Sequence, residues 1–217
     1  MAARLLNSNT SNNSNIIMAV VSKIYCSPDQ SLLVVRRRPH MVMGGGFVVT
    51  DCSQRTLFRV DGCGVIGKMG EVVLRDGQGH PLLLLQRKEG LVQVLHVHRQ
   101  WRGFTSQYEG SQKLAFVLKD PKSCFPFSNA IKISTQPRMN TVKDWDFEIR
   151  GYFPDKDCSI IDHQGSIVAQ IGVRLEMKEL MTTQDLYHVV VSAGIDQAFV
   201  VGIIAVLDSI YGESTIC

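Results

Sequence analysis

The sequence lacks the short motifs that identify the common enzyme classes. Its 217 residues contain no G-x-S-x-G nucleophile elbow, no H-E-x-x-H zinc motif and no Walker phosphate loop. The six cysteines are spread over the whole chain, and no two of them form a C-x-x-C pair. We therefore predict that the protein is not an enzyme and has no catalytic residues, no metal site and no cofactor.

The chain also lacks a strong charge of either sign, and its first residues do not predict a secretory leader. A net charge of +3 does not indicate a nucleic-acid binder, in which a concentrated basic face is expected, but it leaves room for a local basic patch. The first residues contain no uninterrupted apolar stretch of the kind found in signal peptides. We expect an intracellular, cytoplasmic protein with reduced thiols, with membrane association or a nuclear location as the alternatives.

The N-terminus is rich in asparagine and serine, from Asn7 to Asn15, and has too little apolar surface to offset the entropy cost of ordering. We predict a disordered tail over residues 1–27 and a single domain over residues 28–217. Within that tail, Ile16–Tyr25 is apolar and leaves open an early strand or a docked arm.

Three segments repeat one pattern, in which an aspartate opens a short polar turn between two apolar runs. They are Phe47–Val60, Val72–Leu85 with Asp76-Gly77 as its turn, and Ser159–Ile171. The aspartate side chain can hold backbone donors of the turn, and glycine supplies positive φ, so each segment predicts a β-hairpin. Together the three hairpins suggest a meander.

Further short apolar or alternating segments bring the total to roughly a dozen strands, which is typical of an all-β sandwich or barrel. These segments are Leu32–Val35, Leu91–Val97, Gln100–Tyr108, Lys113–Leu118, Ala130–Ser134, Trp145–Tyr152 and Leu186–Val191. Glu176–Thr182 is a short, weak helix candidate.

The segment Ile195–Ile210 differs from everything before it, because Ala198–Leu207 contains no polar side chain. Asp196 suits the N-terminus of a helix and Gly212 suits a position just past its end. About fifteen residues give a helix of about 22 Å, too short for a bilayer core of about 30 Å. A helix that is apolar on all sides and too short to span a membrane is expected to be buried in protein, here among the strands.

Two local patterns resemble binding motifs but lack the required context. Gly62-Cys-Gly-Val-Ile-Gly67 matches G-x-G-x-x-G, yet the residues after it predict a strand, not the helix that a dinucleotide site needs. His96 and His98 would share one face of a strand, but no third metal ligand lies near them in the sequence. We assign neither motif a function.

Taken in order, several segments resemble the plant LURP-one-related family. They are Gly46-Phe-Val-Val-Thr-Asp51, Leu57-Phe-Arg-Val-Asp-Gly62, Val73-Leu-Arg-Asp-Gly-Gln-Gly-His-Pro-Leu-Leu83, Gln86-Arg-Lys88, Trp101-Arg-Gly103, Trp145, Asp162-His-Gln-Gly165 and Val189–Asp208. The resemblance runs from about residue 28 to the C-terminus. It implies a mainly β fold of the tubby type, a closed antiparallel barrel of about twelve strands around one buried hydrophobic C-terminal helix.

The family resemblance implies a role in plant defence or stress response and no established biochemical activity. We expect a monomeric, non-enzymatic module that binds anionic phospholipid or a protein partner, related to tubby-like membrane-tethered transcription regulators. The alternative is a phospholipid scramblase-like membrane protein, which the short helix disfavours.

The candidate contacts to anionic lipid are two basic clusters that follow predicted strands. These residues are Arg36, Arg37, Arg38, Arg87 and Lys88. Charges that deter aggregation at strand edges and turns are the alternative interpretation of the same residues.

Overall fold

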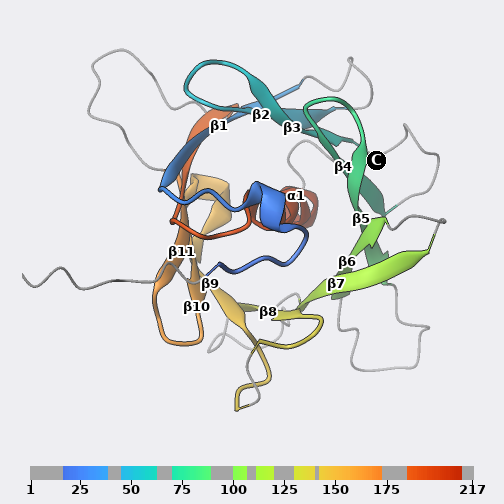
Figure 1. Ribbon diagram of the computed structural model, residues 1–217, viewed down its shortest axis with the longest axis vertical. Helices are drawn as coiled ribbons and strands as arrows, with labels where there is room; N and C mark the ends of the chain where they lie inside the picture. The colour runs from blue at the N-terminus through green and yellow to red at the C-terminus, as the bar shows by residue number, and fades with distance from the viewer. Residues whose placement is uncertain are drawn as a thin grey trace, which may run out of the picture.

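A computed structural model of the chain describes residues 17–38, 45–62, 70–88, 100–106, 111–119, 130–139, 142–172 and 185–211. Twelve strands in these ranges form one closed barrel (Figure 1). The strands are β1 Ser31–Arg37, β2 Gly46–Thr50, β3 Thr56–Asp61, β4 Glu71–Asp76, β5 Pro81–Lys88, β6 Gln100–Ser106, β7 Gln112–Lys119, β8 Ile131–Thr135, β9 Phe147–Tyr152, β10 Asp157–Asp162, β11 Ile167–Ile171 and β12 Leu186–Val191.

Every strand of the barrel pairs antiparallel with its neighbours in the sequence, and β1 closes the barrel against β12. The predicted meander is therefore confirmed, and the barrel, not the sandwich, is the correct architecture. Closure leaves no strand edge unpaired. Two predicted segments, Leu91–Val97 and the weak helix Glu176–Thr182, lie outside the described residues.

The three predicted hairpins end in turns of one design. In each turn one carboxylate oxygen of the leading aspartate accepts two backbone N–H groups, from the second and fourth residues after it. The leading residues are Asp51, Asp76 and Asp162. The predicted role of the aspartates is confirmed, but the positive φ of the second turn belongs to Gly79 and not to Gly77.

The helix α1, Gln197–Tyr211, fills the barrel along its length (Figure 1). All its residues from Ala198 to Asp208 are buried, which explains why the sequence is apolar on every side of the helix. Inward side chains of the strands complete the core around it. Phe199 of α1 lies against the rings of Phe116 and Phe147, with centroid distances of 5.4 and 5.0 Å.

Asp196 begins α1, as predicted, and also fastens the N-terminal arm, residues 17–27. Its Oδ1 accepts the backbone N–H groups of Ala198 and Phe199, while its Oδ2 accepts those of Val20, Val21 and Ser22. Burial of the carboxylate raises its pKa, and these hydrogen bonds act in the opposite direction.

The arm crosses one end of the barrel in front of α1 (Figure 1), and we call this the arm end. The arm contains the 3-10 helix η1, Lys23–Tyr25, and the Tyr25 ring packs on Phe58 at 5.4 Å. The prediction of a disordered tail over residues 1–27 is therefore wrong for residues 17–27, because Asp196 holds the backbone donors of Val20, Val21 and Ser22, and the N–H of Met18 donates to the carbonyl of Gly194. The alternative of a docked arm describes them correctly, and residues 1–16 lie outside the described ranges.

Candidate functional site

The five basic residues predicted to contact lipid do not form one patch. The alternation of β1 turns Arg37 toward the barrel interior, in line with the buried Leu33 and Val35, and leaves Arg36 exposed outside. Lys88 is exposed on β5, which β2, β3 and β4 separate from β1 in the barrel order, whereas Arg87 is half-buried in the inward register of β5. These residues therefore belong to three different environments.

Arg37 anchors the C-terminal end of α1. Its guanidinium lies 3.2 Å from the carboxylate of Asp208, whose side chain is only 1% exposed. A second pair with Asp185 spans 4.0 Å. A buried carboxylate needs a cation beside it, so this contact has a structural explanation, and we leave Arg37 out of any outer binding surface.

Lys156 lies in the same buried region and directly follows the short 3-10 helix η2, Phe153–Asp155. Its Nζ is 4.0 Å from the centre of the Phe153 ring and 5.2 Å from that of Tyr187. Burial, and then the nearby Arg37 guanidinium, lower the pKa of Lys156 to about 8. Burial likewise raises the pKa of the neighbouring Cys158 thiol to about 12, so this cysteine stays protonated at neutral pH and is a poor nucleophile.

Arginines line the outside of β1 to β4. Arg36, Arg59 and Arg75 lie in one cross-strand register, with Val48 of β2 between the first two. Asp61 neutralises much of this side, because its carboxylate pairs with Arg38 at 3.1 Å and with Arg75 at 2.8 Å. The closed barrel has no edge strand, so protection of an edge does not explain these charges.

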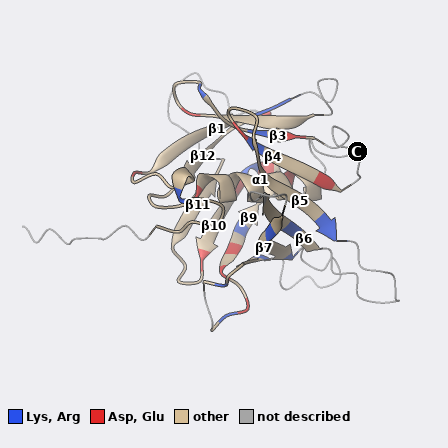
Figure 2. Cartoon of the chain, turned by 45° about the vertical axis from the view of Figure 1, so that its right-hand side comes forward, with Lys and Arg blue, Asp and Glu red and all other residues tan. Residues whose placement is uncertain are grey.

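The outside of β5 to β8 is more uniformly basic, because none of these four strands contains Asp or Glu. Their outer surface carries Lys88, Arg102, Lys119 and Lys132, which we call the lysine face. Figure 2 brings this side of the barrel forward, with the blue end of β5 at its edge. Within the described ranges, no carboxylate forms an ion pair with any of these four residues.

Strand register brings the three lysines of this face together. Lys88 pairs with Gln100, Gln100 with Lys119, and Lys119 with Lys132. Neighbouring strands are about 4.8 Å apart, so the three lysines span about 15 Å. Lys119 and Lys132 are like charges directly opposite each other, which is unfavourable in a sheet, and on the other side of Lys132 the register places Glu148 of β9. The lysine face can therefore bind a group that carries several negative charges.

Other candidate motifs contribute nothing to this surface. The glycine-rich segment from Cys63 onward, together with His96 and His98, lies outside the described residues. The part of the chain that the structure describes contains no group of three His, Cys, Asp or Glu residues placed to hold a metal ion. Among the same residues, no helix is both long and apolar enough to span a membrane.

Comparison with known proteins identifies the relatives of this barrel. The family model described as LURP-one-related matches residues 31–208, which takes in all twelve strands and most of α1. The chain belongs to the LURP-one-related family. The resemblance inferred from the sequence segments is thus confirmed.

Two curated relatives of this LURP-one-related chain are similar over nearly their whole length. Protein LURP-one-related 6 of Arabidopsis thaliana is 51% identical over 200 residues, covering 92% of this chain and 99% of the relative. Protein LURP-one-related 16 of the same plant is 45% identical over 210 residues, covering 94% and 98%. An X-ray structure of an Arabidopsis thaliana protein has the same fold, with a TM-score of 0.64, 22% identity and coverage of 89% of this chain and 98% of that one.

The candidate lipid contacts predicted from the sequence of this LURP-one-related chain did not include Arg102, Lys119 or Lys132. Runs of basic residues in the sequence drew attention to residues 36–38, whereas the lysine face takes one residue from each of four strands. The signal that was available is the absence of acidic residues from four consecutive predicted strands. This absence indicates a basic surface only where the strands are neighbours, as the barrel order shows them to be.

Proposed function

We propose that this LURP-one-related protein is a non-enzymatic module that binds the surface of anionic phospholipid membranes through its lysine face. The observation that carries the proposal is the in-register row of Lys88, Lys119 and Lys132 on four strands that lack acidic residues. Each lysine close to an anionic membrane contributes about 1 kcal/mol. The intracellular location remains a prediction from the sequence, and a setting in plant defence or stress response remains a prediction from the family resemblance.

The burial of α1 favours this role over the scramblase-like alternative. The helix has 15 residues, and its apolar residues already contact the inner wall of the barrel. Using the helix as a membrane anchor would require the barrel to open and to expose its core to water. Binding through the outer lysines requires no such rearrangement.

Vesicle flotation tests the proposal. We expect the protein to float with vesicles that contain phosphatidylserine and a phosphoinositide, and not with pure phosphatidylcholine vesicles. The variant Lys88→Gln/Lys119→Gln/Lys132→Gln removes three charges of the face. It should bind about a hundredfold more weakly, because about 3 kcal/mol of attraction is lost.

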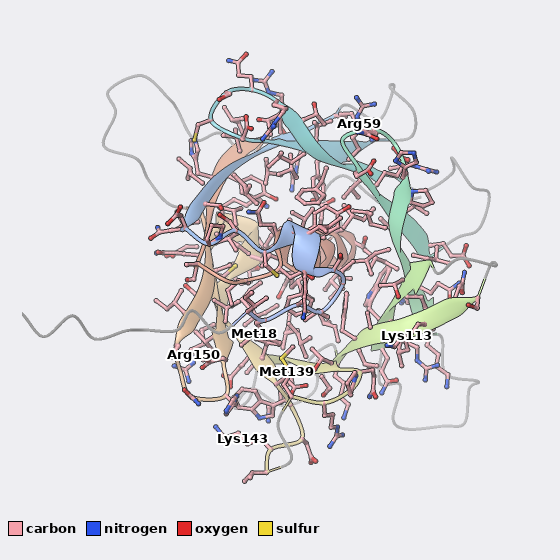
Figure 3. All side chains as sticks on the ribbon, in the orientation of Figure 1. Met18, Arg59, Lys113, Met139, Lys143 and Arg150 are labelled. Atoms are coloured by element: carbon pink, nitrogen blue, oxygen red, sulfur yellow. The ribbon has the colours of Figure 1, made fainter. Side chains whose placement is uncertain are left out.

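A matched control removes three charges from the arginine side, as Arg36→Gln/Arg55→Gln/Arg59→Gln. Arg59 lies on another side of the barrel from Lys113 of β7, one of the strands of the lysine face (Figure 3). The control variant should float like the unchanged protein. If the unchanged protein does not bind at low salt, the proposal is wrong. If only the control variant loses binding, the membrane contact lies on the arginine side and not on the lysine face.

A further inference from the structure

An apolar groove of about 260 Å³ lies on the outside of the barrel over β4 to β6. Its apolar lining comes from Val73, Leu82, Leu84 and Phe104. The alternation of β5 sends Leu83 and Leu85 into the core, so Leu82 and Leu84 are additional apolar residues on the outer surface. Leu82 also packs against the hydrophobic core, whereas Leu84 is not part of it, and water would favour a polar side chain at Leu84.

The groove lies on the same wall as the lysine face. Leu84 and Lys88 share the outer side of β5 and are four residues apart, which is about 13 Å along a strand. Phe104 and Arg102 are two residues apart on β6. Apolar surface and cationic groups thus follow one another along two adjacent strands.

The charged groups around the groove indicate which end of it faces an anion. Toward β4, Arg75 is paired with Asp61, and the carboxylate of Glu71 accepts a hydrogen bond from Gln86. Toward the lysine face, the Nε–H of Arg102 is buried and has no hydrogen-bond partner in the described ranges. Arg102 as a whole is half-buried and lies two residues from Gln100, which pairs with both Lys88 and Lys119, so this end of the wall is cationic.

We infer that this wall binds a single anionic amphiphile, with its acyl chain in the groove and its phosphate or carboxylate head against Arg102 and the lysine row. The inference rests on the proposed function, and it adds that the protein recognises an individual lipid molecule and not only a charged surface. The acyl chain of the lipid points from the lysine face toward the arm end. The chemical class is a single-chain lipid, or one chain of a phospholipid, with an anionic head.

Calorimetry with lysophosphatidates of increasing chain length tests the inference, with each compound below its micellar concentration. Every methylene that leaves water should tighten binding by up to about fourfold, until the groove is full and the affinity levels off. Glycerol phosphate, which carries the head alone, should bind most weakly. Replacing Leu84 by Gln should leave the binding of glycerol phosphate unchanged and abolish the dependence on chain length.

Two further variants make the test specific. Leu82→Gln is a second change in the groove and should likewise abolish the dependence on chain length. Thermal unfolding checks that both variants are folded. Ile167→Gln changes a 55% exposed apolar residue on β11, outside the groove, and should behave like the unchanged protein.

Equal affinity for every chain length, or a chain-length dependence that survives both leucine substitutions, would overturn the inference. If flotation still depends on the lysines while chain length has no effect, only the groove assignment fails. If neither the vesicles nor the soluble lipids bind, the proposed function fails as well.

Discussion

Lys156 places a positive charge where the barrel has little room for water. Only 8% of the residue is exposed, and its backbone adopts the left-handed conformation with φ 53°. Its ammonium lies over the Phe153 ring and near Arg37, and the pKa lies at about 8. The folded state thus releases this proton at lower pH than the unfolded chain, in which lysine titrates near pH 10.4.

This difference predicts how stability varies with pH. Between about pH 8 and 10.4 the unfolded chain binds more protons at Lys156 than the folded protein does, so this residue makes the free energy of unfolding rise with pH. The variant Lys156→Met lacks this contribution. The difference in unfolding free energy, variant minus unchanged protein, should therefore fall as pH increases through this range.

Urea unfolding at a series of pH values measures this difference. Comparing two proteins is necessary because burial raises the pKa of Tyr187 and of Cys158, and both groups lower the stability as pH rises above about 9. The Tyr187 contribution is present in both proteins and cancels. Lys156 lowers the pKa of Cys158, so its removal makes the variant lose more stability above about pH 9 and acts in the same direction as the predicted difference. A difference that stays constant with pH would mean that Lys156 keeps its ordinary pKa in the folded state.

At the scale of elements, a glycine on β6 makes room for a side chain of β7 to contact α1. Gly103 faces the barrel interior, and a Cβ atom there would lie 2.4 Å from the ring of Phe116. The Phe116 ring in turn meets Phe199 of α1 nearly edge-on, with an interplanar angle of 81°. The missing side chain on β6 thus allows a large ring on β7 to reach the central helix.

We predict that Gly103→Ala destabilises the protein by about 1–3 kcal/mol, because the added methyl group displaces the Phe116 ring in a closely packed core. Urea denaturation measures the change. The double variant Gly103→Ala/Phe116→Leu should recover part of the loss, since the smaller side chain leaves room for the methyl group. Equal stability of Gly103→Ala and the unchanged protein would show that the ring moves aside without cost.

The hairpins show how far local sequence determines an element. The aspartate and the apolar runs around it predict all three turns correctly, because their hydrogen bonds join residues at most four positions apart. Gln54 occupies in the first turn the positive-φ position that Gly79 and Gly165 occupy in the others. A prediction based on glycine alone therefore places the positive φ at the wrong residue, as it did at Gly77 instead of Gly79.

At the scale of the whole molecule, the barrel and α1 depend on each other. The inward side chains of the strands and the buried residues of α1 form one hydrophobic cluster. Without the helix, the inner wall would enclose a space too wide for its own side chains to fill.

Ending the chain at Ile195 tests this dependence. We expect an insoluble or unfolded product, because the apolar lining of the barrel would face water. Far-UV circular dichroism and size-exclusion chromatography follow the outcome. A soluble truncated protein with the strand content of the full chain would show that the barrel folds without its central helix.

The sequence by itself predicts short strands joined by tight turns and one buried helix, because these features depend on local patterns and on an apolar run too short for a membrane. The closed barrel was expected from the family resemblance, and the structure confirms it. Only the tertiary structure decides which charges act together. Lys88, Lys119 and Lys132 are far apart in the sequence and become neighbours through strand register, while alternation along β1 turns Arg37 inward to Asp208 and leaves the adjacent Arg36 outside.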